Sequence, residues 1–156
     1  MPKFTAKQDI LNFLKDQCIM TLSTVSKDGR PHTAILLYTA DDDFSIYFIT
    51  HTDSKKTNNI AQNKFVSLAI WDIKKMSLQI EGEAAPVTDR QKQEDVIERI
   101  LASNVVRKDF WPPMLSIKGQ AYTVFKIKPN SILRFDLTQG HNSNEVPMTK
   151  IDLSTE

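Results

Sequence analysis

The short connections between its β-rich stretches constrain this chain more than any other feature. These stretches follow one another across turns of a few residues, such as Lys27-Asp28-Gly29-Arg30, in which Gly29 can adopt a positive φ. Parallel neighbouring strands need a long crossover connection, usually a helix. The pattern therefore predicts a mainly β (α+β) fold with about six antiparallel strands closed into a barrel, rather than a parallel α/β sheet.

Strands and helices are expected in a fixed order along the chain. The expected strands span residues 18–26, 31–40, 44–50, 65–72, 76–87 and a last pair, 120–128 and 131–136, that Pro129-Asn130 interrupts. Helices are expected over residues 5–17 and 54–62, and from a capping box at Thr88 to about residue 104. No repeat or linker divides the chain, so we expect one domain over residues 1–136. Residues 137–156 form a polar tail, with a strand or edge contact expected near 148–153.

Charge and cysteine content exclude several classes of partner. The chain has 156 residues and a formal net charge of +1, which gives no electrostatic reason to bind nucleic acid. Its single cysteine, Cys18, cannot form an internal disulfide. Its N-terminus does not resemble a secretory signal, and no apolar run is long enough for a membrane span. These features predict a cytoplasmic protein without a membrane partner.

A polar corner at residues 50–56 joins the strand that begins at Ile46 to a short helix. Ser54 has the chemistry of an N-cap, because its hydroxyl can accept a hydrogen bond from an unpaired amide of the first turn. A helix start favours an anion, and Lys55 and Lys56 add two positive charges. Both a phosphate site and an ordinary capped helix with solvated lysines remain open on these residues alone.

The stretch from Ala34 to Tyr38 is apolar at every position. A strand with one face in the core and the other in solvent would instead alternate apolar and polar residues. A closed barrel covers only the inner face of such a strand. The outer face should therefore be covered by a helix, a ligand or a second subunit.

Common catalytic motifs are missing from the sequence. The three histidines and Cys18 have no metal-ligand spacing, so no metal site is expected. There is no G-x-S-x-G elbow, Walker A motif or G-x-G-x-x-G fingerprint. The catalytic residues, if any, remain unknown, and a bound cofactor is the natural source of chemistry.

Three motifs together resemble the FMN-binding split-barrel family, which includes pyridoxamine 5′-phosphate oxidase and smaller general stress proteins. They are Phe48-Ile49-Thr50, Ser54-Lys55-Lys56, and Asn63 followed by Val66-Ser67. Lys64 replaces the proline that usually follows the asparagine. The similarity covers about residues 18–89, and the order of elements agrees to about residue 136.

The resemblance implies that FMN binds at the interface of a homodimer. It implies contacts to the phosphate and ribityl oxygens from Thr50, Ser54, Lys55 and Lys56. The other cofactor contacts that it implies are Thr33, Ala34, Ile35, Leu36, Ile49, Ser77, Gln79 and, from the other subunit, Trp111.

Departures from the family pattern leave the reaction open. The oxidase has an arginine in place of Thr33, a glutamine in place of Ser77 and basic residues after the position of Gly140 that this chain lacks. We therefore expect an FMN-dependent oxidoreductase that acts on an unidentified small substrate, with NAD(P)H as a candidate donor. The alternatives are a non-catalytic flavin-binding stress protein and a true pyridoxamine 5′-phosphate oxidase. A deazaflavin, or haem with His32 or His51 as ligand, also stays open.

Overall fold

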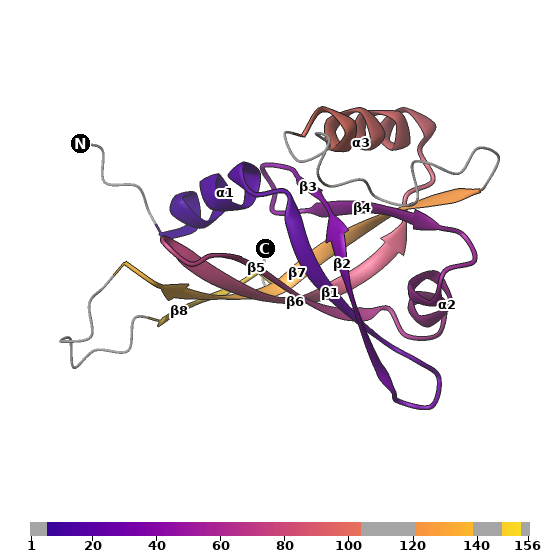
Figure 1. The fold of residues 1–156 in the computed structure, drawn as a ribbon, viewed down its shortest axis with the longest axis horizontal. Helices are drawn as coiled ribbons and strands as arrows, with labels where there is room; N and C mark the ends of the chain where they lie inside the picture. The colour runs from indigo at the N-terminus through magenta and orange to yellow at the C-terminus, as the bar shows by residue number, and fades with distance from the viewer. Residues whose placement is uncertain (1–5, 104–120, 139–147, 154–156) are drawn as a thin grey trace.

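The computed structural model describes residues 6–103, 121–138 and 148–153. Within these residues, eight strands form one curled antiparallel sheet with three helices around it (Figure 1). The strands are β1 (Ile19–Val25), β2 (Pro31–Leu37), β3 (Thr39–Ala40), β4 (Ile46–His51), β5 (Phe65–Asp72), β6 (Met76–Pro86), β7 (Tyr122–Asp136) and β8 (Met148–Asp152). The helices are α1 (Ala6–Asp16), α2 (Lys55–Gln62) and α3 (Arg90–Ala102). The predicted antiparallel split barrel is confirmed.

The sheet order is β2-β1-β5-β6-β7-β4-β3, so its two edges are consecutive in the chain. Only Tyr38 separates β2 at one edge from β3 at the other. Its side chain is buried, and its hydroxyl donates a 2.8 Å hydrogen bond to the Leu14 carbonyl of α1. The single strand predicted over residues 31–40 is therefore broken at this anchored residue, and the chain itself joins the two edges of the barrel.

The predicted count of about six strands was too low. Besides the break at Tyr38, a strand near residue 148 is present as β8, which pairs with β7. The expected interruption at Pro129 does not end a strand, because β7 continues through a bulge: Pro129 lies opposite Gly82, Ser131 opposite Glu81, and Asn130 has no opposite residue. Gly82 permits this close approach, since a Cβ there would lie 2.5 Å from the Lys128 carbonyl oxygen.

Apolar side chains form two clusters. The larger fills the barrel and includes Ile10 and Leu14 of α1. The smaller lies beneath α3 and consists of the buried side chains Leu37, Tyr47, Ile49, Val96, Ile100 and Val124. The N-cap of α3 is Asp89 rather than the predicted Thr88, because its carboxylate accepts the Lys92 amide at 3.1 Å.

No helix in the described part of the chain is long and apolar enough to cross a membrane.

Candidate functional site

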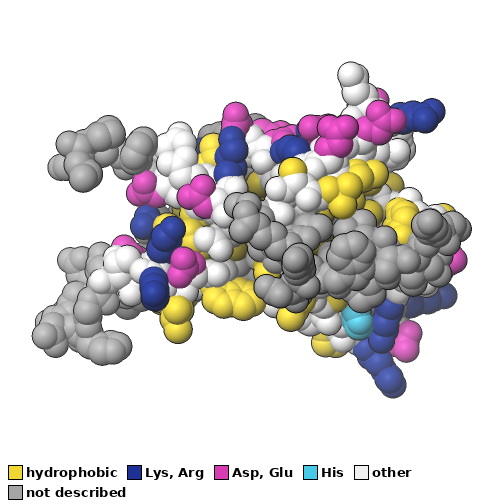
Figure 2. Space-filling model, turned by 45° about the horizontal axis from the view of Figure 1, so that its top comes forward, with side chains coloured by type: hydrophobic (Ala, Val, Ile, Leu, Met, Phe, Trp, Pro, Cys, Tyr) yellow, Lys and Arg dark blue, Asp and Glu magenta, His cyan; other side chains and the backbone are white. Residues whose placement is uncertain are grey.

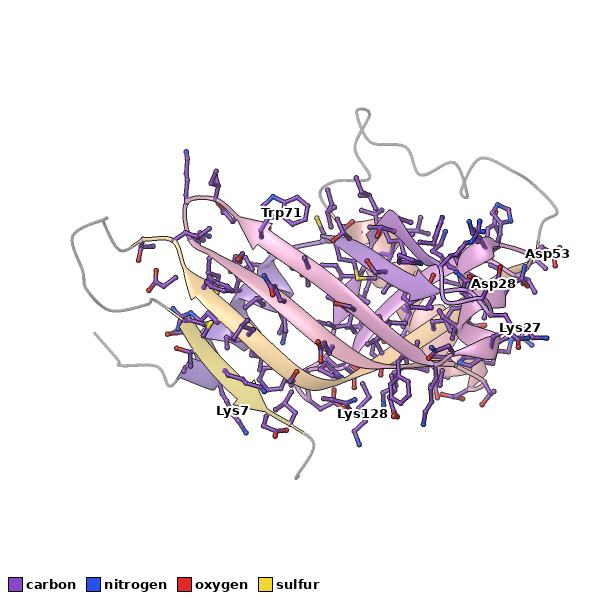
Figure 3. The ribbon with its side chains drawn as sticks, turned by 90° about the horizontal axis from the view of Figure 1, so that it is seen from below. Lys7, Lys27, Asp28, Asp53, Trp71 and Lys128 are labelled. Atoms are coloured by element: carbon purple, nitrogen blue, oxygen red, sulfur yellow. The ribbon has the colours of Figure 1, made fainter. Side chains whose placement is uncertain are left out.

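The polar corner lies at one end of the barrel, where β4 leads into α2. The turn that contains Asp53 lies at the same end of the molecule as the β1–β2 turn with Lys27 and Asp28, while Trp71 lies on a different part of the sheet (Figures 1 and 3). The chain thus places the start of α2 beside the outer end of the β1–β2 hairpin.

Two strand edges near this corner have no neighbouring strand. β2 pairs with β1 along one edge, and β3 pairs with β4 only at Tyr47 and Ile46. Among the described residues, no strand pairs with the other edge of β2, or with residues 48–50 on the side of β4 away from β7. The backbone N–H and C=O groups that point out from these two edges are therefore available to a ligand.

Hydroxyl groups form a short chain at the start of α2. Ser54 is the N-cap, as predicted, and accepts hydrogen bonds from the Thr57 amide at 3.2 Å and the Thr50 hydroxyl at 3.0 Å. Thr57 donates its own hydroxyl hydrogen to the His51 carbonyl at 2.8 Å. The Ser54 hydroxyl hydrogen is therefore left to donate, either to Thr57 Oγ1 at 3.1 Å or to a ligand.

Lys55 and Lys56 carry the positive charge of the corner. Neither forms an ion pair with any carboxylate among the described residues. Lys56 is partly buried, and this burial lowers the pKa of its ammonium group. The first amides of a helix also lack intrahelical acceptors. The corner therefore has two cations without a carboxylate partner among the described residues, together with free N–H donors, which fits a phosphate group.

α2 is held in place by a buried hydrogen bond. Asn59 is 5% exposed, and its amide donates to the Thr24 hydroxyl of β1 at 2.9 Å. Thr24 lies opposite His32 in the β1–β2 ladder. His32 Nδ1 is buried and has no hydrogen-bond partner in the described part of the chain. Burial of the ring lowers the pKa of His32, and the charges of Lys55 and Lys56 lower it further.

The structure brings together four of the predicted contacts: Thr50, Ser54, Lys55 and Lys56. On β2, Thr33 and Ile35 face outward, and the Thr33 hydroxyl lies 2.9 Å from that of Ser23. Leu36 is buried in the barrel, and Ala34 is half-buried on the same face. The side chain of Ile49 packs beneath α3, so any contact that Leu36 or Ile49 makes to a ligand must come from the backbone.

Ser77 and Gln79 do not join the corner within one chain. They lie on the outward face of β6, where Ser77 pairs with Trp71 near the β5–β6 turn. The helix α2 leads into the opposite end of β5, at Phe65. Trp111 lies outside the described residues.

Sequence reasoning did not single out the supporting residues Thr24, Thr57 and Asn59. A polar asparagine on the apolar face of a short helix was the available signal for Asn59. The spacing of Ser54 and Thr57 was the signal for the hydroxyl chain. Among the residues described, no three His, Cys, Asp or Glu side chains gather as a metal site.

Comparison with known proteins places the chain in a family. The family model described as pyridoxamine 5′-phosphate oxidase matches residues 6–135. A pyridoxine/pyridoxamine 5′-phosphate oxidase of Pseudomonas fluorescens is 34% identical over 125 residues, which are 78% of this chain and 56% of that protein. One from Pseudomonas entomophila is 36% identical over 55% of this chain and 40% of that protein. The chain thus spans about half the length of the curated relatives that it matches.

Solved structures share the fold at low identity. General Stress Protein 26 of Bacillus anthracis aligns with a TM-score of 0.66 at 22% identity, over 94% of this chain and 98% of that one. A pyridoxamine 5′-phosphate oxidase-related, FMN-binding protein of Nostoc punctiforme aligns with a TM-score of 0.61 at 17% identity, over 98% and 99%. A heme-binding protein of Mycobacterium smegmatis gives 0.71 at 12% identity, over 97% and 60%.

The curled antiparallel sheet is a split β-barrel of the kind found in these solved structures. The chain belongs to the pyridoxamine 5′-phosphate oxidase family.

Proposed function

We propose that the protein is an FMN-binding flavoprotein that uses the flavin as the redox centre for a small substrate. The observation that carries this proposal is the pair Lys55 and Lys56, which lies at a helix start without a carboxylate partner among the described residues. A phosphomonoester dianion matches two ammonium groups and free helix amides. Family membership and the FMN-binding description of the Nostoc punctiforme neighbour support the same ligand.

The residues of the corner would have different roles in FMN binding. Lys55, Lys56 and the Ser54 hydroxyl would hold the phosphate, while Thr50 keeps Ser54 oriented through its 3.0 Å hydrogen bond. The open edge of β2, along residues 33–36, would supply backbone groups to the polar rim of the flavin ring. A bound flavin supplies the electron-transfer chemistry, and the protein fixes its position and shields it from water.

A homodimer would complete the site. The outward face of the sheet has Ile35 61% exposed and Trp71 51% exposed. In the strand register, Thr21 of β1 lies between Ile35 and Ala69, and Ala69 is two residues from Trp71 on β5. A second copy on this face would cover them, which is one of the three ways to cover the apolar β2 sequence. It would also bring Ser77 and Gln79 of one subunit towards the flavin of its partner, which they cannot reach within their own chain.

The dimer is tested by the variant Ile35→Lys, studied by light scattering during size-exclusion chromatography. We expect a dimer for the unchanged protein, and a monomer with weakened FMN binding for the variant. A variant that is monomeric yet binds FMN as tightly as before would show that the flavin site needs one subunit only.

The visible spectrum of the purified protein, with mass identification of any released molecule, tests the cofactor. We expect flavin absorbance, either at once or after FMN is added. A protein that stays colourless with FMN contradicts the proposal. A haem spectrum would favour the other ligand class seen among the structural neighbours. Anaerobic mixing with NADH or NADPH then separates an oxidoreductase from a flavin-binding protein without turnover, since bleaching of the flavin band is expected only for the former.

A further inference from the structure

His32 lies on the face of β2 that looks towards α2. The strand alternates exposed and less exposed positions, and His32 shares the inner face with Ala34 and Leu36. Thr24 lies directly opposite it on β1 and is hydrogen-bonded to Asn59 of α2. The imidazole is therefore on the side of the sheet that the helix covers, at the level of the polar corner.

One nitrogen of the His32 ring has no hydrogen-bond partner among the described residues. Nδ1 is buried and forms no hydrogen bond with the described residues. Buried polar atoms without a partner are rare in folded proteins, and each needs an explanation such as a missing ligand or water. The Thr24 hydroxyl across the ladder accepts a hydrogen bond from Asn59 and forms none with this nitrogen.

Most of the charged groups around His32 are positive. The titratable groups on the neighbouring elements at this end are Lys27, Asp28 and Arg30 in the β1–β2 turn, His51 at the end of β4, Asp53 in the turn that follows, and Lys55 and Lys56 on α2. Burial lowers the pKa of His32, and the charges of Lys55 and Lys56 lower it further. Figure 2 shows Lys and Arg side chains, with an acidic side chain among them, beside a histidine at one end of the visible face.

We propose that His32 is a third ligand of the bound phosphate, beside Lys55 and Lys56, and that it takes up one proton from solvent when FMN binds. The inference rests on the proposed function, since it assigns a further residue to the same site. In the free protein, burial of the ring and the charges of Lys55 and Lys56 disfavour the protonated imidazole. A phosphate dianion offsets those charges and provides the acceptor that the ring lacks.

The direction of the proton linkage follows from these charges. The pKa of His32 lies below its usual 6.5 in the free protein, and the dianion should raise it above that value. Between the two pKa values, FMN binding is accompanied by proton uptake, so the contribution of His32 to affinity grows as the pH falls from about 8 to about 6.5. The phosphate itself gains a proton near pH 6, which weakens binding in every variant alike.

The test compares the full-length protein with His32→Gln. Calorimetry at about pH 6.5, in two buffers of different ionisation enthalpy, gives FMN affinity and proton uptake together. We expect the variant to bind FMN about tenfold more weakly and to lose most of the proton uptake, as fits the loss of one charge-assisted hydrogen bond. At about pH 8 the difference should shrink to about threefold or less, because His32 is then largely neutral.

Riboflavin and His51→Gln provide the controls. Riboflavin lacks the phosphate, so its affinity should be the same in the unchanged protein and in His32→Gln. The ring of His51 packs against Tyr122, with centroids 5.2 Å apart, and its replacement should leave proton uptake intact. Equal FMN affinity and equal proton uptake in His32→Gln would overturn the inference while leaving the flavin site standing.

The unchanged protein provides a second measurement that does not depend on the variant folding. NMR titration of the imidazole resonances of His32 should show its pKa rise when FMN is bound. A pKa that FMN leaves unchanged would also overturn the inference. If FMN does not bind at all, the proposed function and this inference both fail, and that result is distinct from either failure above.

Discussion

The helices α2 and α3 present basic residues in opposite ways. On α3, Lys92 lies 2.7 Å from Asp41 and Arg99 lies 2.8 Å from the other oxygen of that carboxylate, while Asp95 contacts both cations. On α2, Lys55 and Lys56 have no carboxylate partner among the residues described. Ion pairs with Asp41 hold α3 against the barrel, whereas the two lysines of α2 are available to bind a ligand.

The difference extends to how each helix is attached. The Lys92 ammonium also lies 4.7 Å from the centre of the Tyr47 ring, above the apolar cluster that α3 covers. α2 buries little apolar surface, only Ile60 among its side chains, and depends on the bond from Asn59 to Thr24. The helix α2 is thus held in place by a hydrogen bond between two neutral side chains, and its lysine charges stay available to a ligand.

The largest expected effect is on the unpaired cations. Lys55→Ala with Lys56→Ala should weaken FMN binding by about 100-fold or more, because the phosphate loses two charge-assisted contacts. Flavin fluorescence titration measures the change. Lys74→Ala with Lys75→Ala is the matched control, since it removes an exposed lysine pair from the β5–β6 turn. Equal losses in both double variants would mean that α2 attracts FMN only through overall charge.

The paired carboxylate should affect stability instead. Asp41→Asn leaves Lys92 and Arg99 with only Asp95, and we expect the free energy of unfolding to fall by about 1–2 kcal/mol, as suits a half-buried ion network. Urea denaturation measures it. Asp42→Asn is the control, because Asp42 is 82% exposed and, within the described part of the chain, pairs only with Lys15. A drop in FMN affinity with no loss of stability would contradict the contrast between the two helices.

The sequence predicted much of this arrangement because its signals were local. Alternating residues and tight turns specified the antiparallel strands, and Ser54 specified the start of α2. The break at Tyr38 and the bulge at Asn130 escaped prediction, since each depends on a distant partner: the carbonyl of Leu14 for Tyr38, and Gly82 on β6 for the bulge.

The site was predictable to the same extent. The motif placed Thr50, Ser54, Lys55 and Lys56 together because they are neighbours in the chain. His32 comes from another strand, and only the fold brings it to the corner. Likewise, no local pattern reveals that the side chain of Ile49 lies beneath α3 rather than beside a ligand.

Removing the hydrogen bond between Asn59 and Thr24 should have smaller effects, on both stability and FMN affinity. Asn59→Ala leaves the buried Thr24 hydroxyl without its donor, and we expect the free energy of unfolding to fall by about 1 kcal/mol. Because the start of α2 is then less firmly placed, FMN affinity should fall by about threefold to tenfold. Chemical denaturation and flavin titration measure the two effects. Asn58→Ala, an exposed neighbour on α2, should change neither; a loss of stability without any loss of affinity would show that Asn59 does not position the site.

The smallest effect expected is a difference in acid sensitivity between the two helices. Partial burial raises the pKa of Asp41, but hydrogen bonds and charges from Lys92 and Arg99 outweigh it and hold the pKa below its usual 3.8. A carboxyl group with a lowered folded-state pKa stabilises the protein fully above its unfolded value, and that stabilisation is lost as the pH falls through the folded value. The stability difference between the unchanged protein and Asp41→Asn should therefore be constant from about pH 7 to about pH 5 and diminish below about pH 4. Urea denaturation across this range measures it, and a difference that persists undiminished at the acid end would mean that Asp41 stabilises α3 by packing rather than by charge.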